Sequence, residues 1–282
     1  MKILIITGRN RWFLRAGVEE MERRLRHAGW DCDRKSLDEF LRSPPPRLHY
    51  DDVAVAGGDG TIHAALPLLS PWPLLVIPAG TGNDFARSVS IRTLADCIRH
   101  LTAGRRIRID TGLVELEGRS EPFLNGAGIG LDGLVARAHE RKLPYGLGVV
   151  AALLKRPVHR ASLTVDGRAH EEETEFFSLI VANGRAFGGG YRLAPNALLD
   201  DGLLDVIVIR PLPRLTALRY LGKAREGRHL DHPAVEWFRC RELLVASAQP
   251  LPFHLDGEFR EGTQLRFQCL PSSQVVYGIL PA

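Results

Sequence analysis

Val53-Ala-Val-Ala-Gly-Gly-Asp-Gly-Thr61 is an apolar run that breaks into a glycine turn, after which Ile62-His-Ala-Ala-Leu-Pro-Leu-Leu69 resumes with a helix-like pattern. The order predicts a strand, a turn and a helix. With Gly57, Gly58 and Gly60 the turn is nearly free of side chains, so successive backbone N–H groups can point at one spot before the helix and bind phosphate there. Asp59 would act through a divalent cation, directly or by water. A glycine-rich turn without any ligand is the alternative.

A second strand-to-turn pattern follows in Leu74-Leu-Val-Ile-Pro-Ala-Gly-Thr-Gly-Asn-Asp-Phe85. Its turn contains Gly80, Thr81 and Gly82, and either Asn83 or Asp84 is the expected N-cap of the next helix. Ligands of parallel sheets bind at the carboxyl ends of the strands. We therefore expect both turns to lie at one sheet edge and to bind one nucleotide.

The two motifs together resemble a known family. GGDGT at 57–61 followed by PAGTGNDFA at 78–86 is similar to the signature of the diacylglycerol-kinase-type lipid kinases, which include bacterial diacylglycerol kinases, YegS-like kinases, and sphingosine and ceramide kinases. Later segments resemble the family's later blocks in the family's order, namely Asn125–Asp132, Asn183–Gly190, Ala194–Asp205 and Leu255–Glu258. The resemblance implies an enzyme that uses ATP and Mg²⁺ to phosphorylate a lipid hydroxyl.

The 282 residues suffice for two domains with their own cores. Strand–helix alternation predicts an α/β, Rossmann-like nucleotide-binding domain with a parallel sheet over residues 1–110. Alternating and apolar strands then predict a mostly β sandwich over residues 111–282, which would bind the lipid substrate. The resemblance also allows the last residues to return to the first domain.

Individual elements follow from the same patterns. Asp166-Gly167 between β-rich runs predicts a hairpin. The segment 214–228 is typical of a basic amphipathic helix, either packed on a sheet, which is favoured, or docked on a membrane. The other expected strands are 2–7, 176–182, 203–209, 242–246, 265–269 and 275–280, and the other expected helices are 16–28, 134–139 and 144–155.

An acidic turn, Asp200-Asp-Gly-Leu-Leu204, offers carboxylates and carbonyl oxygens of the kind that Mg²⁺ takes as ligands. The resemblance implies a bound Mg²⁺ that uses Asp201 with the carbonyls of Leu198 and Leu203. The alternative is an acidic turn that only begins a strand. Asn183 with the glycines 188–190 lines a cleft or forms a corner.

His254-Leu-Asp-Gly-Glu258 places three polar side chains at alternate positions, which would share one face of a regular strand. A metal site is one interpretation. We favour a second one, in which the Asp-Gly pair turns the chain and the carboxylates of Asp256 and Glu258 supply a general base and its partner. Asp256 is our choice of base, and the reverse assignment and a plain hairpin tip remain open.

Composition sets further bounds. The net charge of +4 is spread along the chain, which does not indicate a nucleic-acid partner and suits anionic lipid equally well. The four cysteines are far apart with no Cys-x-x-Cys pair, and the start is too short for a signal-peptide core. We expect a cytoplasmic protein, soluble or peripheral at the inner face of the membrane. A homodimer is compatible with these features.

Three rival functions remain. An NAD-kinase-like enzyme also uses GGDGT, although PAGTGNDFA argues against it. A dinucleotide oxidoreductase would need Gly-x-Gly-x-x-Gly after the first strand, where this chain has Thr7-Gly-Arg-Asn. A non-catalytic lipid-binding protein on the same fold is the third. The family commonly follows GGDGT with a helix start that carries Asn-Glu, whereas this chain has Ile62-His63-Ala64, and the missing acid could weaken the metal or nucleotide network.

Overall fold

The computed structural model describes residues 1–8, 12–140, 152 and 158–280. The predicted helix 144–155 lies outside this range except for Ala152. The chain divides into two compact units, Met1–Asp110 with Ser272–Ala282, and Thr111–Pro271. The strands β5 (Arg106–Leu116) and β14 (Glu258–Tyr277) each run from one unit into the other.

The first unit is built on a parallel sheet in the order β4-β3-β1-β2. Its strands are β1 (Lys2–Thr7), β2 (Asp31–Ser36), β3 (Asp52–Gly57) and β4 (Leu74–Pro78), and the end of β14 adds one parallel pairing, Val276 with Leu74. Every residue of β3 is buried, as expected for a strand covered on both faces.

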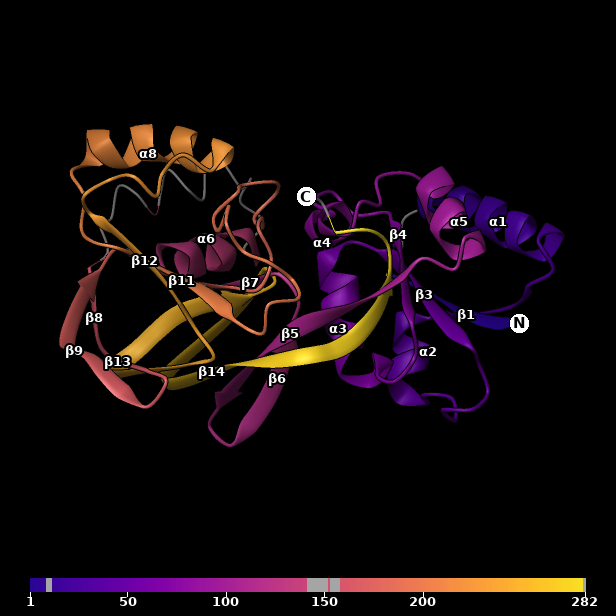
Figure 1. Cartoon of the computed structure of the whole chain (residues 1–282), viewed down its shortest axis with the longest axis horizontal. Coiled ribbons are helices and arrows are strands. Elements are labelled where there is room, and N and C mark those ends of the chain that lie inside the picture. Colours follow the sequence, from indigo (N-terminus) through magenta and orange to yellow (C-terminus); the bar gives the residue numbers. More distant parts are fainter. Residues whose placement is uncertain (9–11, 141–151, 153–157, 281–282) are drawn as a thin grey trace. The chain divides into compact units, whose positions relative to one another are not determined.

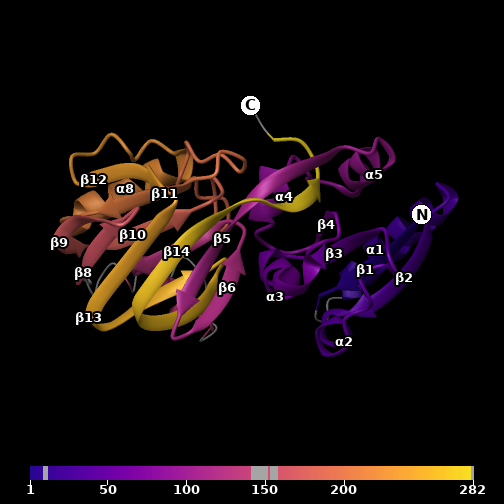
Figure 2. The same cartoon turned by 60° about the horizontal axis from the view of Figure 1, so that its bottom comes forward.

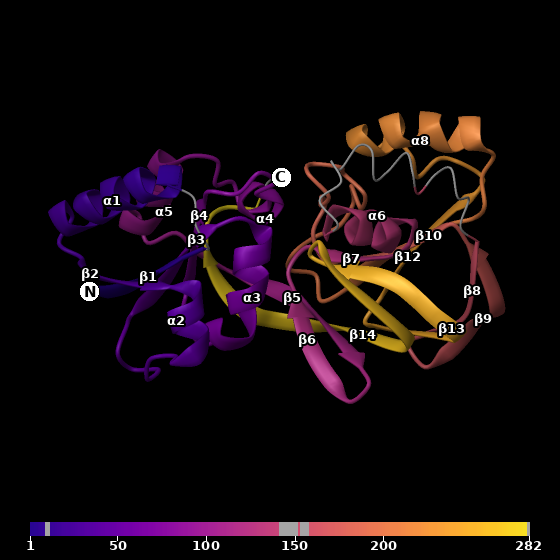
Figure 3. The ribbon, with the colours of Figure 1, turned by 180° about the vertical axis from the view of Figure 1, so that it is seen from behind.

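Helices cover both faces of this sheet. Figures 1 and 3 show α1 (Trp12–His27) and α5 (Leu94–Thr102) on one face, and α2 (Leu37–Arg42) and α3 (Asp59–Leu69) on the other. α1 begins four residues earlier than its apolar pattern predicted. Thr93 caps α5 as part of a capping box with Asp96. The short α4 (Asp84–Ser88) follows β4.

The second unit is mostly antiparallel β structure (Figure 2). One path of paired strands runs β12-β11-β10-β7-β13-β14, β8 pairs with β13 and β9, and β5 pairs with β14 and β6. The bounds are β6 (Arg119–Phe123), β7 (Gly126–Gly130), β8 (His159–Val165), β9 (Arg168–Phe176), β10 (Ser178–Ala182), β11 (Leu204–Ile209), β12 (Val235–Cys240) and β13 (Glu242–Leu255).

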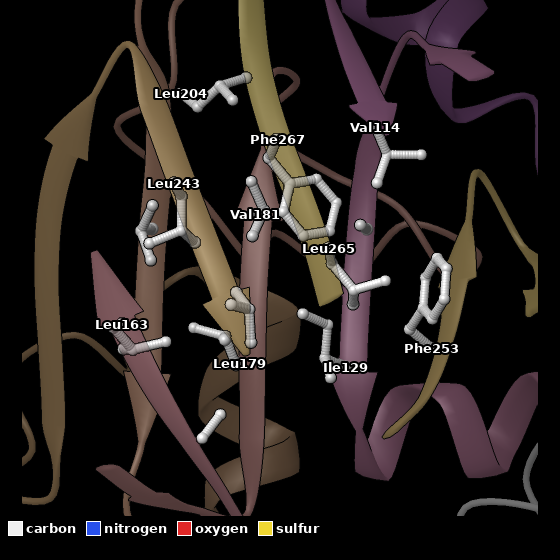
Figure 4. Packing of buried hydrophobic residues seen from close by; sticks show 14 of the residues in the cluster. Val114, Ile129, Leu163, Leu179, Val181, Leu204, Leu243, Phe253, Leu265 and Phe267 are labelled. Atoms are coloured by element: carbon white, nitrogen blue, oxygen red, sulfur yellow. The ribbon is translucent and has the colours of Figure 1, made fainter. Parts of the chain in front are cut away.

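The strand β13 changes partners along its length. Its first half pairs with β8 and its second half with β7, while β14 follows it throughout except for a register shift between Ala246 and Leu251. A strand that changes neighbours at such an irregularity lets a sheet fold over on itself. Between the resulting layers lies an apolar core that includes Val181, Phe253 and Phe267 (Figure 4).

α6 (Leu131–Glu140) packs against β7 and β13, and α8 (Arg214–Glu226) lies on the same side of this unit (Figure 1). Ala217 and Tyr220 of α8 belong to a second apolar cluster, Ala224 is also buried, and Arg219 and Lys223 are exposed. The expected helix packed on a sheet is therefore present. The amphipathic pattern predicted that Leu215, Leu218, Leu221 and Ala224 form the apolar stripe; Ala224 is buried, and the side chains of the three leucines lie outside the description.

Three predicted strands have other bounds in the structure. The segment 242–246 belongs to the longer β13, and the separate strands 265–269 and 275–280 fall on the single strand β14, which ends at Tyr277. Proline cannot donate a hydrogen bond to a strand ladder. Pro250 falls within the stretch of β13 where the register with β14 shifts.

Candidate functional site

The two glycine turns of the first unit lie directly against each other. β3 and β4 are parallel neighbours with Gly57 opposite Pro78, so both turns leave the same sheet edge, as predicted. A Cβ added to Gly80 would stand 2.3 Å from the Cα of Gly58, a distance that no real Cβ adopts. The two backbones therefore meet without any side chain between them.

Asp59 joins the second turn to the first. Its Oδ2 accepts a hydrogen bond from the backbone N–H of Asp84 at 3.0 Å, and its Oδ1 accepts one from Phe85 at 2.9 Å. These are the first two amides of α4, and the side chain of the N-cap residue Asn83 makes no hydrogen bond to them. Asp59 thus caps α4 across the two turns, a role that the sequence pattern did not reveal.

Asn83 shapes the second turn instead. Its backbone is left-handed at φ 54°, and its amide exchanges two hydrogen bonds of 2.8 Å with the backbone of Gly80. Thr81, the outermost residue of this turn, is exposed, and Asp84 is buried in an ion pair with Arg87. The turn is therefore fixed by its own side chains before any ligand binds.

The hydroxyl of Thr61 fills the space left by two other glycines. A Cβ on Gly57 would stand 2.4 Å from Thr61 Oγ1, and a Cβ on Gly8 would stand 2.7 Å from the same atom. Gly8 follows β1 and donates its N–H to Ala56 at 2.9 Å. The loop after β1 therefore reaches the same edge, and the contact of Gly8 with Thr61 was not predicted.

In the second unit, Asp256 and Gly257 form the hairpin tip between β13 and β14, with φ values of 46° and 98°. The carboxylate of Asp256 is 9% exposed and turned inward. It accepts hydrogen bonds from the backbone N–H groups of Leu124, Asn125 and Gly126 at 2.8, 2.8 and 3.0 Å. Glu258, the first residue after the tip, is exposed. The carboxylate of Asp256 is thus bound to the backbone of residues 124–126, whereas Glu258 is open to solvent.

Asn183 also holds the backbone of residues 124 and 125. Its Nδ2 donates to Leu124 O at 2.8 Å and its backbone N–H donates to Asn125 O at 2.9 Å. The loop that follows it contains Gly188–Gly190, all with positive φ. Three of the motif blocks, at 125–132, 183–190 and 255–258, thus converge around residues 124–126.

The acidic turn has a cationic neighbour that sequence reasoning missed. Arg239 Nη1 lies 3.5 Å from Asp201 Oδ2, and its Nε lies 3.5 Å from the Oδ1 of the buried Asp205. Burial raises the pKa of Asp205, and the hydrogen bond from Trp237 and the charge of Arg239 oppose that rise. Asp201 Oδ1 accepts from Leu203 N at 3.1 Å. Leu198 is partly exposed.

Within the described part of the chain, no three His, Cys, Asp or Glu side chains gather as a metal site. His254, Asp256 and Glu258 are accordingly not a ligand set. A cation at Asp201 would depend on carbonyl oxygens as well. Asp201 Oδ2 is buried and accepts no hydrogen bond, although Arg239 Nη1 lies 3.5 Å from it, and a carboxylate oxygen in this state fits a hard cation.

The chain joins a parallel α/β unit, which carries two apposed glycine turns, to an antiparallel β unit. Two family models match the chain: residues 16–114 match the diacylglycerol kinase catalytic domain, and residues 129–277 match the YegS C-terminal NAD kinase beta sandwich-like domain. The chain belongs to the diacylglycerol kinase and YegS family of lipid kinases.

Individual relatives agree with that assignment. A "Probable lipid kinase YegS-like" of Pseudomonas aeruginosa is 34% identical over 242 residues, which cover 83% of this chain and 78% of the relative. A "Diacylglycerol kinase" of Staphylococcus carnosus is 28% identical over 222 residues, covering 74% and 71%.

Solved structures share the fold. A diacylglycerol kinase of Bacillus anthracis aligns with a TM-score of 0.71 at 20% identity over 98% of this chain and 96% of that one. An NAD kinase of Archaeoglobus fulgidus aligns with a TM-score of 0.58 at 14% identity over 98% and 93%. The similarity to NAD kinase therefore concerns the fold alone, while the family is that of the lipid kinases. No helix in the described residues is both long and apolar enough to cross a membrane.

Proposed function

We propose that this protein transfers the γ-phosphoryl group of ATP to the hydroxyl of a membrane lipid of the diacylglycerol or sphingoid type. One observation carries the proposal: the turns 57–61 and 80–84 meet backbone to backbone and are tied together by Asp59, in a chain that has both domains of the lipid kinase family. Exposed amides of the two turns would cradle the phosphates, because the N–H groups before a helix favour anions.

Asp256 and Glu258 would act on the lipid hydroxyl. A hydroxyl is a poor nucleophile, and a carboxylate within hydrogen-bond reach can take its proton as the bond to phosphorus forms. Asp256 is the base in this proposal, since three amides hold its carboxylate in one orientation. Glu258, exposed beside it, would orient the acceptor, or the two roles are reversed.

Mg²⁺ would be held at the acidic turn by Asp201 with the carbonyls of Leu198 and Leu203. When bound, Mg²⁺ supplies positive charge that offsets the negative charge of phosphate and carboxylate groups. Phosphoryl transfer needs little covalent help from the protein, so the contribution of this chain is mainly to position the two substrates. The lipid acceptor places the reaction at the membrane surface.

An acceptor screen tests the proposal. Purified protein is incubated with γ-labelled ATP, Mg²⁺ and an extract of mixed lipids, with NAD offered in parallel. We expect label in the organic phase, in a lipid with a new phosphate monoester. Label in the dinucleotide alone would assign the protein to NAD kinase chemistry, and ATP hydrolysis without any labelled acceptor would contradict lipid phosphorylation.

A further inference from the structure

His254 lies in β13, two residues before the hairpin tip, and is only 6% exposed. Its Nδ1 accepts a hydrogen bond of 3.2 Å from the backbone N–H of Gly257. A backbone N–H can only donate, so Nδ1 must carry a lone pair, and the proton of the neutral ring is on Nε2. The imidazole therefore closes the Asp256–Gly257 turn from the inside.

The surroundings of the ring are built for this orientation. His254 pairs with Gly128 across β13 and β7, and a Cβ on Gly128 would stand 2.7 Å from His254 Nε2. The same Cβ would stand 2.5 Å from the Cβ of Asp132 at the start of α6. Phe187 contacts the ring edge to face, with centroids 5.8 Å apart. The glycine of the 125–132 block thus makes room for the imidazole.

The turn itself needs such support. Asp256 has a positive φ of 46°, which a residue with a Cβ adopts only at a cost. Its backbone N–H donates to Gly126 O at 2.9 Å, and its carboxylate binds the amides of residues 124–126. Gly257 has no side chain that could hold it in place. The hydrogen bond from its backbone N–H to His254 Nδ1 fixes the amide instead.

We propose that His254 is a positioning residue that holds the Asp256–Gly257 turn in place through the Gly257 amide. It thereby fixes the direction in which the carboxylates of Asp256 and Glu258 are presented. The catalytic consequence rests on the function proposed above, whereas the positioning itself can be measured without any turnover. An error of about 1 Å in such a group can cost about 10²-fold in rate.

Three substitutions separate the hydrogen bond from the volume of the ring. His254→Asn offers a carbonyl oxygen near the place of Nδ1, His254→Gln moves that oxygen toward the place of Nε2, and His254→Leu removes it. We expect kcat to fall about 10- to 100-fold in the Leu and Gln variants and to stay within about 3-fold in Asn, with the KM for ATP changed less than about 3-fold throughout. His229→Leu, which removes a fully buried imidazole elsewhere in the unit, is the matched control.

Two measurements without turnover complete the test. Hydrogen exchange of the Gly257 amide should be slow in wild type and His254→Asn and faster in Leu and Gln. The ¹⁵N resonances of the wild-type ring should show an unprotonated Nδ1 at neutral pH. A protonated Nδ1, or exchange of the Gly257 amide that is unchanged in His254→Leu, would overturn the proposal. Wild-type turnover in His254→Leu, with the Gly257 amide no longer protected from exchange, would also overturn it. If wild type phosphorylates no lipid, the proposed function fails while these two measurements still decide the role of His254.

Discussion

The backbone of Gly80 lies so close to that of Gly58 that a single methyl group is the sharpest probe of the nucleotide turns. In Gly80→Ala the new Cβ would stand 2.3 Å from Gly58 Cα, and the neighbouring atom is backbone that cannot swing away. We expect the turns to separate, kcat/KM for ATP to fall about 10²-fold and the free energy of unfolding to drop by about 1–3 kcal/mol. Steady-state kinetics with varied ATP and denaturant unfolding measure the two effects, and calorimetric titration with ATP measures the affinity.

Gly222→Ala is the matched control for this substitution. Gly222 lies in α8, where an added Cβ meets nothing within 4 Å. Alanine favours a helix over glycine by about 1 kcal/mol, so this variant should be as stable as wild type or more so. ATP affinity equal to that of wild type in Gly80→Ala would show that the turns do not bind the phosphates.

Asp256 has a structural role that complicates its use as a test of catalysis. Asparagine has one acceptor oxygen, so in Asp256→Asn an NH₂ group would face at least one of the three amides that now donate to the carboxylate. We expect a loss of about 1–3 kcal/mol in the free energy of unfolding, in addition to a fall of about 10²–10⁴-fold in turnover with ATP affinity nearly unchanged. The substitution therefore does not preserve the hydrogen bonds of the site.

Glu258→Gln provides the comparison. Glu258 is exposed, so the free energy of unfolding should change by less than about 0.5 kcal/mol. A larger fall in turnover for Glu258→Gln than for Asp256→Asn would reverse the assigned roles. Normal turnover in both variants would remove the hairpin tip from the mechanism.

Among the strands, the end of β14 is held in the first unit by a polar cluster in which Asp52 and Tyr277 are buried and Arg106 is partly exposed. Tyr277 donates its hydroxyl to Asp52 at 3.0 Å and accepts from Arg106 at 2.8 Å, and Arg106 also pairs with Asp52 at 2.8 Å. Burial raises the pKa of Tyr277 to about 12, and the negative charge of Asp52 adds to that rise. The cluster joins the starts of β3 and β5 to the end of β14.

This cluster predicts a pH dependence of stability. In the unfolded chain a tyrosine loses its proton near pH 10, before the folded Tyr277 does, so stability from this group is present below pH 10 and is lost as the pH rises toward about 12. In Tyr277→Phe we expect that part of the decline, about 2 kcal/mol, to disappear. Denaturant unfolding of both proteins at pH 9 to 11.5 measures the difference, and parallel curves would contradict it.

The basic face of α8 is available for an anionic partner. Arg219 and Lys223 are exposed while Ala217, Tyr220 and Ala224 are buried. If this face docks on anionic bilayers, Arg219→Glu with Lys223→Glu should weaken vesicle binding about 10-fold or more, and added salt should do the same. Arg119→Glu with Arg168→Glu, at two exposed hairpin turns, is the control for net charge. Equal binding by both double variants would leave α8 as packing only.

The strands that sequence reasoning found were those with strong apolar patterns, such as β3, β10 and β11. β7 was not predicted as a strand, because Gly126-Ala-Gly-Ile-Gly130 has the composition of a loop. Its glycines are explained by tertiary neighbours, since Gly126 meets Phe187 and Gly128 meets His254. Such contacts join residues far apart in the chain and leave no periodic signal.

The two turns of the proposed nucleotide site could be predicted to meet, because parallel strands place their carboxyl ends at one edge. The hydrogen bonds of Asp59 to α4 and of Asp256 to residues 124–126 could not be predicted. An aspartate in a sequence motif looks the same whether its carboxylate binds a metal, a proton or a backbone amide. The position of Arg239 beside Asp201 was missed for a related reason: the two residues lie 38 positions apart in the sequence, on different elements.

The central claim is that the joined turns deliver the γ-phosphoryl group of ATP to a lipid hydroxyl. The most direct measurement is transfer of ³²P from γ-labelled ATP to diacylglycerol and sphingosine in mixed micelles with Mg²⁺, for wild type and Gly80→Ala side by side. We predict labelled lipid monophosphate with wild type and about 10²-fold less with Gly80→Ala. Lipid that stays unlabelled with wild type, or is labelled equally by Gly80→Ala, would contradict the claim.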